Sequence, residues 1–210
     1  MSRRPQFAES PAPGGFAHIQ RFRDAKGGGF VSRILPGELY VTTEDESITT
    51  ILGSCISACI RDSLAGVGGM NHFMLPEEGV RDEGPRPAGL ATRYGSYAME
   101  SLINELLKRG ARRERLEIKL FGGGRILASL TDVGQRNIDF IHEYLRTEGL
   151  TIAAEDLGDI QPRKVAYSPR TGKARIKRLP ALESTLVADR ERKYLQSIGS
   201  VAAGGDVELF

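Results

Sequence analysis

With 210 residues, the chain has the length of a single domain of ordinary size, enough to bury a real hydrophobic core. Hydrophobic residues make up 40% and charged residues 27%, the balance of a globular protein, and no apolar run approaches the roughly 18 residues that a membrane helix needs. The net charge of +2 and the two cysteines argue against a strongly basic nucleic-acid binder and against a disulfide framework. The small number of cysteines predicts a protein of the reducing cytoplasm, and the lack of a long apolar run predicts no membrane insertion.

Both ends of the chain are predicted to be irregular. Residues 1–32 are rich in proline, glycine and arginine and show no sustained hydrophobic period. Their basic start has no apolar stretch behind it, so it does not read as a secretory signal. Near the other end, Ala-Ala-Gly-Gly at 202–205 is typical of a loose tail. We therefore expect a flexible extension over 1–32, one ordered domain over 33–197 and a loose tail over 198–210.

Hydrophobic periodicity and turn residues predict the elements between these ends. In chain order they are strands at 37–42, 47–52, 56–61 and 66–74, a helix at 94–107 closed by Gly110, a strand at 117–121, a helix at 134–146, strands at 151–155, 163–168 and 173–179, and a helix at 182–198. Charges, glycines and prolines at 77–89 predict a loop at the rim of a site. Because strands and helices are segregated, the fold class is predicted as α+β, with mixed or antiparallel sheets packed against helices.

Cys55 and His72 are the residues that most suggest chemistry. Cys55 follows a Gly-Ser turn, and His72 follows a glycine-rich step on a neighbouring strand. A thiol is only a few per cent ionised at neutral pH, and an imidazole within hydrogen-bond reach can take its proton. The same imidazole can then deliver the proton to a leaving amine. The pair is therefore a candidate nucleophile and base of a cysteine hydrolase.

Such a pair needs two kinds of support. A third group normally holds the imidazole in the useful tautomer, and the hydroxyl or carbonyl of Thr49 or Thr50, on the strand that leads to Cys55, could do so. Backbone N–H groups of the tight turn at Gly53 and Ser54 could form an oxyanion hole.

The other residues of interest have plainer interpretations. Cys59 lies in an apolar run and is expected to be a buried structural thiol, while His18 and His142 are expected to be bystanders. Two cysteines four residues apart do not match common zinc spacings, so no metal is expected. Three glycines at 122–124 lack the lysine and the Ser/Thr of a phosphate-binding loop and predict a close backbone approach. Basic clusters at 108–115 and 170–178 are read as solvated surface, although a basic face for an acidic partner stays open.

Beyond these individual residues, the sequence resembles the chemoreceptor glutamine deamidase family of bacterial chemotaxis, CheD. The resemblance spans about 33–180 and follows the order and spacing of several motifs. These are Thr49 with Leu52-Gly53-Ser54-Cys55, Arg61-Asp62, Gly69-Met70-Asn71-His72-Phe73-Met74-Leu75-Pro76, Lys119-Leu120-Phe121-Gly122-Gly123-Gly124, Val133-Gly134-Gln135-Arg136-Asn137, Glu155-Asp156-Leu157-Gly158 and Arg163-Lys164-Val165 with Thr171-Gly172.

The resemblance implies a function and a site. It implies a Cys-His-Thr triad of Cys55, His72 and Thr49, the threonine six residues before the cysteine, with no cofactor. The implied reaction converts glutamine side chains of methyl-accepting chemotaxis receptors to glutamate with release of ammonia, and some members also hydrolyse glutamyl methyl esters. The implied fold is an α/β sandwich similar to the catalytic domain of cytotoxic necrotizing factors. A CheC-type phosphatase is an implied partner.

Three alternatives remain open from the sequence. The chain could act mainly by binding a receptor or a CheC-type phosphatase, with weak catalysis. It could be a general cysteine amidase or esterase for small molecules. A nucleic-acid binder is the third, and it rests only on the arginine clusters.

Overall fold

The computed structural model describes residues 12–13, 15–24, 29–75, 90–126 and 132–202, and for 90–93, 181–182 and 199–202 it describes the backbone alone. Three helices and ten strands are found there, with one short 3-10 turn, η1 (Arg113–Arg115). The helices are α1 (Leu90–Lys108), α2 (Val133–Thr147) and α3 (Ala181–Ala202). The strands are β1 (Gln20–Arg23), β2 (Phe30–Arg33), β3 (Leu39–Thr42), β4 (Glu46–Leu52), β5 (Ile56–Asp62), β6 (Val67–Asn71), β7 (Glu117–Gly122), β8 (Ile152–Leu157), β9 (Arg163–Ser168) and β10 (Lys173–Arg178).

The strands form two five-stranded sheets. The first sheet has the order β1-β2-β4-β9-β10 and the second has the order β3-β6-β5-β7-β8. Both sheets are mixed, because β2 pairs with β4 and β7 pairs with β8 in parallel while the other neighbours are antiparallel. The predicted α+β class is therefore confirmed.

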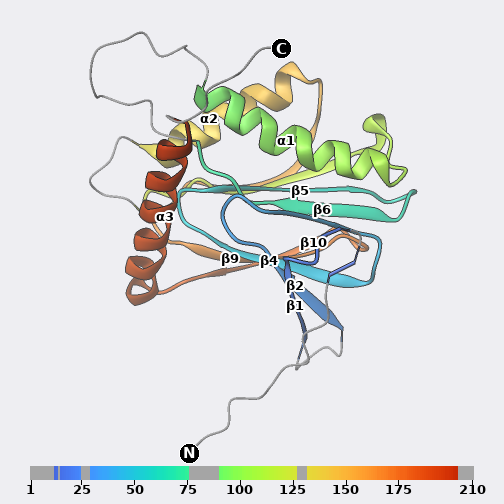
Figure 1. Ribbon diagram of the computed structural model, residues 1–210, viewed down its shortest axis with the longest axis horizontal. Helices are drawn as coiled ribbons and strands as arrows, with labels where there is room; N and C mark the ends of the chain where they lie inside the picture. Colours follow the sequence, from blue (N-terminus) through green and yellow to red (C-terminus); the bar gives the residue numbers. More distant parts are fainter. Residues whose placement is uncertain (1–11, 14, 25–28, 76–89, 127–131, 203–210) are drawn as a thin grey trace, which may run out of the picture.

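The sheets and helices lie in layers. In Figure 1 the two sheets lie one above the other, and α1 and α2 lie beyond the second sheet. Helix α1 packs on β3, β5 and β6, and α2 packs on β5. Helix α3 stands apart from these layers, at one end of both sheets (Figure 1). Buried side chains of both sheets and all three helices join in one hydrophobic cluster.

The crossing between the two sheets positions the candidate site. Strand β4 belongs to the first sheet and β5, the next strand along the chain, belongs to the second. The three residues between them, Gly53, Ser54 and Cys55, therefore carry the chain from one layer to the other. All three are buried. Such a crossing leaves backbone groups without a sheet partner, and their hydrogen bonds define the site described below.

Several predicted boundaries differ from the structure. The extension predicted at 1–32 contains β1 and all but the last residue of β2; the two strands pair with each other and join the first sheet through β4. These strands were not predicted because proline and glycine nearby indicated irregular structure, and because four residues are too few to show a hydrophobic period. Strand β6 ends at Asn71 because the next residues leave the ladder and form an isolated bridge from Phe73 to Ile56. Helix α3 runs to Ala202, past the predicted end at 198. The loop predicted at 77–89 lies outside the described residues.

No helix in the described ranges has the length and apolar character to span a bilayer.

Asp62, at the end of β5, ties the second sheet to the segment around η1. Its carboxylate accepts hydrogen bonds from the backbone of Leu64, Ala65 and Arg112 and from the Arg115 side chain. Burial alone would raise the pKa of Asp62, but the bonds from Arg115 and from the backbone outweigh burial and hold the pKa at about 2. The carboxylate thus favours the folded state wherever it is ionised.

Replacing Asp62 with asparagine is expected to lower the free energy of unfolding at pH 7 by about 2 kcal/mol. Because the folded-state pKa lies below the unfolded value, this contribution is present above pH about 4 and fades as the pH falls toward 2. Chemical denaturation of wild type and Asp62→Asn at pH 7 and pH 3 measures it, and the difference should shrink by roughly half. The control is Asp45→Asn at an exposed carboxylate. A difference that did not change with pH would point to lost packing instead of lost charge.

Candidate active site

The carbonyl groups of the crossing loop are all held from the side of β7 and α2. Gly124 N donates to Gly53 O at 2.6 Å and Gly123 N donates to Cys55 O at 2.8 Å. Asn137 Nδ2 of α2 donates to the Ser54 carbonyl at 2.8 Å, and its Oδ1 accepts from Leu75 N at 2.9 Å. With its carbonyls fixed in this way, the loop has a single backbone conformation.

Glycine is required where β7 approaches the loop. Gly122 has φ +113°, and a Cβ there would lie 2.0 Å from the Cys55 carbonyl oxygen. A Cβ on Gly134, at the start of α2, would lie 2.6 Å from the Gly123 carbonyl oxygen. No side chain fits at either place. The close backbone approach predicted for the glycines at 122–124 is confirmed.

The N–H groups of the same loop point to one place, where the carboxylate of Glu191 lies. Glu191 comes from α3 and is 2% exposed. It accepts hydrogen bonds from the backbone N of Gly53 at 2.8 Å, of Ser54 at 2.8 Å and of Cys55 at 3.3 Å, and from Ser54 Oγ at 2.6 Å. Three N–H groups that converge on one anion form the kind of cradle that stabilises an oxyanion. The loop expected to supply oxyanion donors therefore binds an anion, and here that anion is a side chain of the same chain.

His72 is fixed beside this loop by backbone pairing. The residue after it, Phe73, forms a two-way bridge with Ile56, the residue after Cys55, through N–O distances of 2.9 Å. On its other side, His72 N donates to Glu38 O at 2.9 Å and Gly37 N donates to His72 O at 2.8 Å. A ring nitrogen of His72, Cys55 Sγ and a Glu191 oxygen all lie within 4.8 Å of one another. The structure thus brings the predicted thiol and imidazole together.

The tautomer of His72 follows from the groups around Thr50. Thr50 Oγ1 lies 2.8 Å from His72 Nδ1 and 2.8 Å from the carbonyl oxygen of Ile34. The carbonyl can only accept, so the single hydroxyl proton of Thr50 goes to Ile34 and the oxygen accepts from Nδ1–H. Nε2 then carries a lone pair and no proton. It is buried and has no hydrogen-bond partner among the described residues. An unprotonated Nε2 is the nitrogen that a neighbouring thiol needs as its base.

The side-chain hydrogen bond of Thr49 goes to another strand and not to the imidazole. Adjacent residues of a strand point to opposite faces, so Thr49 and Thr50 cannot serve the same side of β4. Thr49 Oγ1 donates instead to the carbonyl oxygen of Val165 on β9 at 2.7 Å. Of the two candidates that the residues themselves allowed, the structure places Thr50 on the imidazole, whereas the family resemblance had favoured Thr49.

Thiol and imidazole are both neutral in this arrangement. Burial raises the pKa of the Cys55 thiol well above its usual range, and the negative charge of Glu191 raises it further. Burial lowers the pKa of His72 to about 3. Neither residue offers more than 2% of its surface to solvent. The nucleophile is therefore neither ionised nor reachable in this conformation.

The spacing of Cys55, His72 and Glu191 would also suit a metal ion, since a thiolate, an imidazole and a carboxylate are common zinc ligands. The environment of Glu191 argues against that use. Its two oxygens already accept four hydrogen bonds from the loop, and donors that converge on one point attract an anion and repel a cation. The residues fit an anion site.

The remaining sequence candidates lie elsewhere. Cys59 is fully buried in the middle of β5, where burial raises its pKa, which agrees with a structural thiol. His18 is exposed, and His142 pairs with Glu155 on the surface. Sequence reasoning missed Glu191, and it named Asn137 only as part of a motif, with no role in the site. Each is a polar residue on an otherwise buried helix face, and that signal could have found them.

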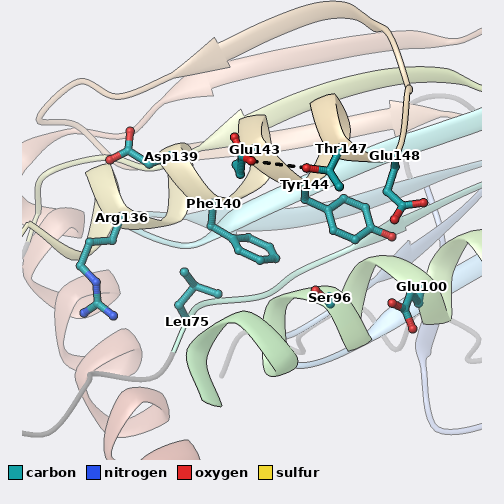
Figure 2. Close-up of a pocket in the computed structure, with 10 residues that line it drawn as sticks. All are labelled: Leu75, Ser96, Glu100, Arg136, Asp139, Phe140, Glu143, Tyr144, Thr147 and Glu148. Carbon is teal, nitrogen blue, oxygen red and sulfur yellow. Dashed lines mark hydrogen bonds between the residues drawn. The ribbon is translucent and has the colours of Figure 1, made fainter. Parts of the chain in front are cut away.

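A separate groove lies between α1 and α2, with a cavity volume of about 500 Å³. Figure 2 shows Phe140 and Tyr144 of α2 pointing toward α1, where Ser96 and Glu100 lie. None of the residues that line it is Cys55, His72 or Glu191. The groove is therefore not part of the candidate active site.

Comparison with known proteins points to the same family as the resemblance found in the sequence. A family model described as CheD chemotactic sensory transduction matches residues 74–178. A protein of Halorhodospira halophila named "Probable chemoreceptor glutamine deamidase CheD" is 53% identical over 201 residues, covering 93% of this chain and 92% of that protein. A protein of the same name from Hydrogenovibrio crunogenus is 52% identical over 192 residues, covering 91% of this chain and all of that protein. The resemblance is confirmed, and the chain belongs to the CheD family.

Proposed function

We propose that this protein is a chemoreceptor glutamine deamidase, the activity for which its relatives are named. The observation that carries the proposal is the junction of the two sheets, where a cysteine, a histidine of defined tautomer and three converging N–H groups meet. These are the parts that acyl transfer from an amide requires: a nucleophile, its base and donors for the oxyanion.

The mechanism assigns one role to each group. Nε2 of His72 takes the thiol proton, and the Cys55 sulfur attacks the carboxamide carbon of the substrate glutamine. The oxygen that becomes negative is held by the N–H groups of the loop. Gly53 and Ser54 give the loop the conformation in which these groups converge. The carbon–nitrogen bond breaks as the imidazolium protonates the departing ammonia. Water, activated by the same imidazole, then hydrolyses the thioester to glutamate and frees the thiol.

Thr50 is the positioning residue of this mechanism. Its hydroxyl holds Nδ1–H throughout, so the histidine keeps Nε2 for the proton transfers. We assign the third place of the triad to Thr50 for this reason, and we assign Thr49 the role of tying β4 to β9.

We also propose the wider setting of the reaction. Its substrates are proposed to be glutamines on the cytoplasmic helical bundle of methyl-accepting receptors, with the enzyme in the cytoplasm, and the names of its relatives support a chemoreceptor as substrate. A glutamyl methyl ester would react by the same steps, with methanol as the leaving group in place of ammonia. A CheC-type phosphatase is a further proposed partner. We also propose that the two packed sheets with flanking helices correspond to the catalytic domain of cytotoxic necrotizing factors.

Mass spectrometry of a receptor cytoplasmic fragment tests the function. Incubation with the purified full-length protein is expected to add the mass increment of one deamidation per modified glutamine, at a few defined positions. Free glutamine and a small methyl ester, treated in parallel, should stay nearly unchanged, because a protein-directed site needs the surrounding helix to bind. Equal turnover of free glutamine would indicate a general amidase. An unmodified receptor fragment, bound but intact, would indicate a binding protein.

A further inference from the structure

Glu191 lies where the proposed reaction would leave its product. Deamidation converts a glutamine carboxamide to a glutamate carboxylate, held at that moment by the N–H groups of the loop. Glu191 is a glutamate, and its carboxylate accepts from those same groups. One of its oxygens lies within 4.8 Å of Cys55 Sγ and of a ring nitrogen of His72. The side chain thus has the chemistry and the position of a bound product.

Helix α3, which carries Glu191, has one buried face, and Glu191 lies on that face. Over 183–198, where the side chains of α3 are described, the buried residues are Val187, Ala188, Glu191, Leu195 and Ile198, and steps of three and four place them on one face. The other residues of this face are apolar, so the carboxylate interrupts it at its centre. A buried carboxylate is costly unless it is fully hydrogen-bonded, and a core helix would ordinarily place an apolar residue here. The loop N–H groups are what make this position tolerable for a charge.

Tyr194 makes a second contact between α3 and the rest of the protein. The hydroxyl of Tyr194 meets the hydroxyl of Tyr94 from α1. The Tyr194 ring packs over Gly37, where a Cβ would lie 2.8 Å from its hydroxyl oxygen. Gly37 donates to the His72 carbonyl, so α3 is anchored on both the cysteine and the histidine side of the site.

We infer that α3 is a tethered product mimic, which closes the active site by placing Glu191 in the cradle meant for the substrate side chain. The inference rests on the proposed function. It follows that α3 must withdraw before a glutamine of another protein can reach Cys55. The surface exposed by its departure accepts a helix, with a glutamine in the place of Glu191 and apolar residues four positions before and four after it, as Val187 and Leu195 are placed now.

Closure also explains why the thiol is unreactive in this conformation. Glu191 excludes solvent from Cys55 and adds a negative charge beside it, and both effects raise the pKa of the thiol. Withdrawal of α3 removes both at once. A substrate helix that displaces α3 therefore also activates the nucleophile, and the enzyme stays idle without its protein substrate.

Converting the mimic into a substrate gives the sharpest test. In full-length Glu191→Gln, the carboxamide lies beside Cys55, so attack by the thiolate, loss of ammonia and hydrolysis of the thioester should return glutamate at position 191. Mass spectrometry of the peptide that contains residue 191 should show this conversion over time, and the double variant Cys55→Ala with Glu191→Gln should keep its glutamine. If the introduced glutamine persists in a Glu191→Gln protein that deamidates a receptor fragment, Glu191 does not occupy the product position.

A second variant tests closure through the accessibility of Cys55 as well as through activity. Glu191→Ala should raise the rate of Cys55 alkylation by iodoacetamide, and the rate of receptor deamidation, by at least about tenfold, the factor expected from losing a charge-assisted hydrogen bond. Glu183→Ala, an exposed carboxylate on the same helix, is the matched control and should change neither. Alkylation and deamidation rates equal to wild type would overturn the inference. A receptor fragment left unmodified by both wild type and Glu191→Ala, while Glu191→Ala still exposes Cys55 to iodoacetamide, would instead refute the proposed function and leave the closure standing.

Discussion

Cys55→Ala is expected to lower the rate of receptor deamidation by at least about 10³-fold while leaving the fold intact. The loss is large because the thiolate forms the covalent bond of the proposed mechanism, and the loop N–H groups alone cannot replace it. The rate is measured as ammonia release, or as the mass increment of the receptor fragment, under conditions in which wild type completes the reaction.

Cys59→Ala is the matched control for this variant. Both cysteines are fully buried and they lie four residues apart in the chain, and each substitution removes one sulfur atom. Each variant should unfold at slightly lower denaturant concentration than wild type, since each leaves a small cavity. Only Cys55→Ala should lose activity. Deamidation that survived in Cys55→Ala, or that vanished equally in both, would show that Cys55 is not the nucleophile.

The sequence predicted the elements that carry strong periodicity and missed those set by tertiary contacts. Helix α2 was foreseen because its buried positions recur at steps of three and four. Strands β1 and β2 were not, because four residues are too few for a pattern, and they are held by pairing with each other and with β4. Tertiary pairing overrides weak local preference in such short strands.

The same division applies to the site. Cys55 and His72 stood out in the sequence because a Gly-Ser turn precedes the cysteine and a glycine-rich step precedes the histidine, and the structure brings them together. Glu191 was hidden, since 136 residues separate it from Cys55 and only the folded chain joins them. The choice between Thr49 and Thr50 depends on which face of β4 looks toward His72. Spacing along the chain cannot decide that, because a shift of one residue reverses the face.

Thr50→Val is expected to lower kcat for deamidation by about 10²-fold or more, with little change in KM. Valine keeps the shape of threonine and removes its oxygen, so Nδ1 loses its acceptor. The imidazole is then free to carry its proton on Nε2, where it can no longer accept from the thiol. Since the substrate does not touch Thr50 in the proposed mechanism, binding should be preserved. Thr50→Ser restores the oxygen and should recover most of the activity, which a purely structural role for the methyl group would not allow.

Thr49→Val distinguishes the role of Thr49 from that of Thr50. It removes the bond to the Val165 carbonyl and is expected to lower the free energy of unfolding by about 1 kcal/mol, because that buried acceptor loses its donor. Its kcat should stay within a few-fold of wild type, since His72 keeps its partner. The reverse outcome, with Thr49→Val inactive and Thr50→Val active, would mean that β4 turns its other face to the histidine during catalysis. The third residue of the triad would then be Thr49.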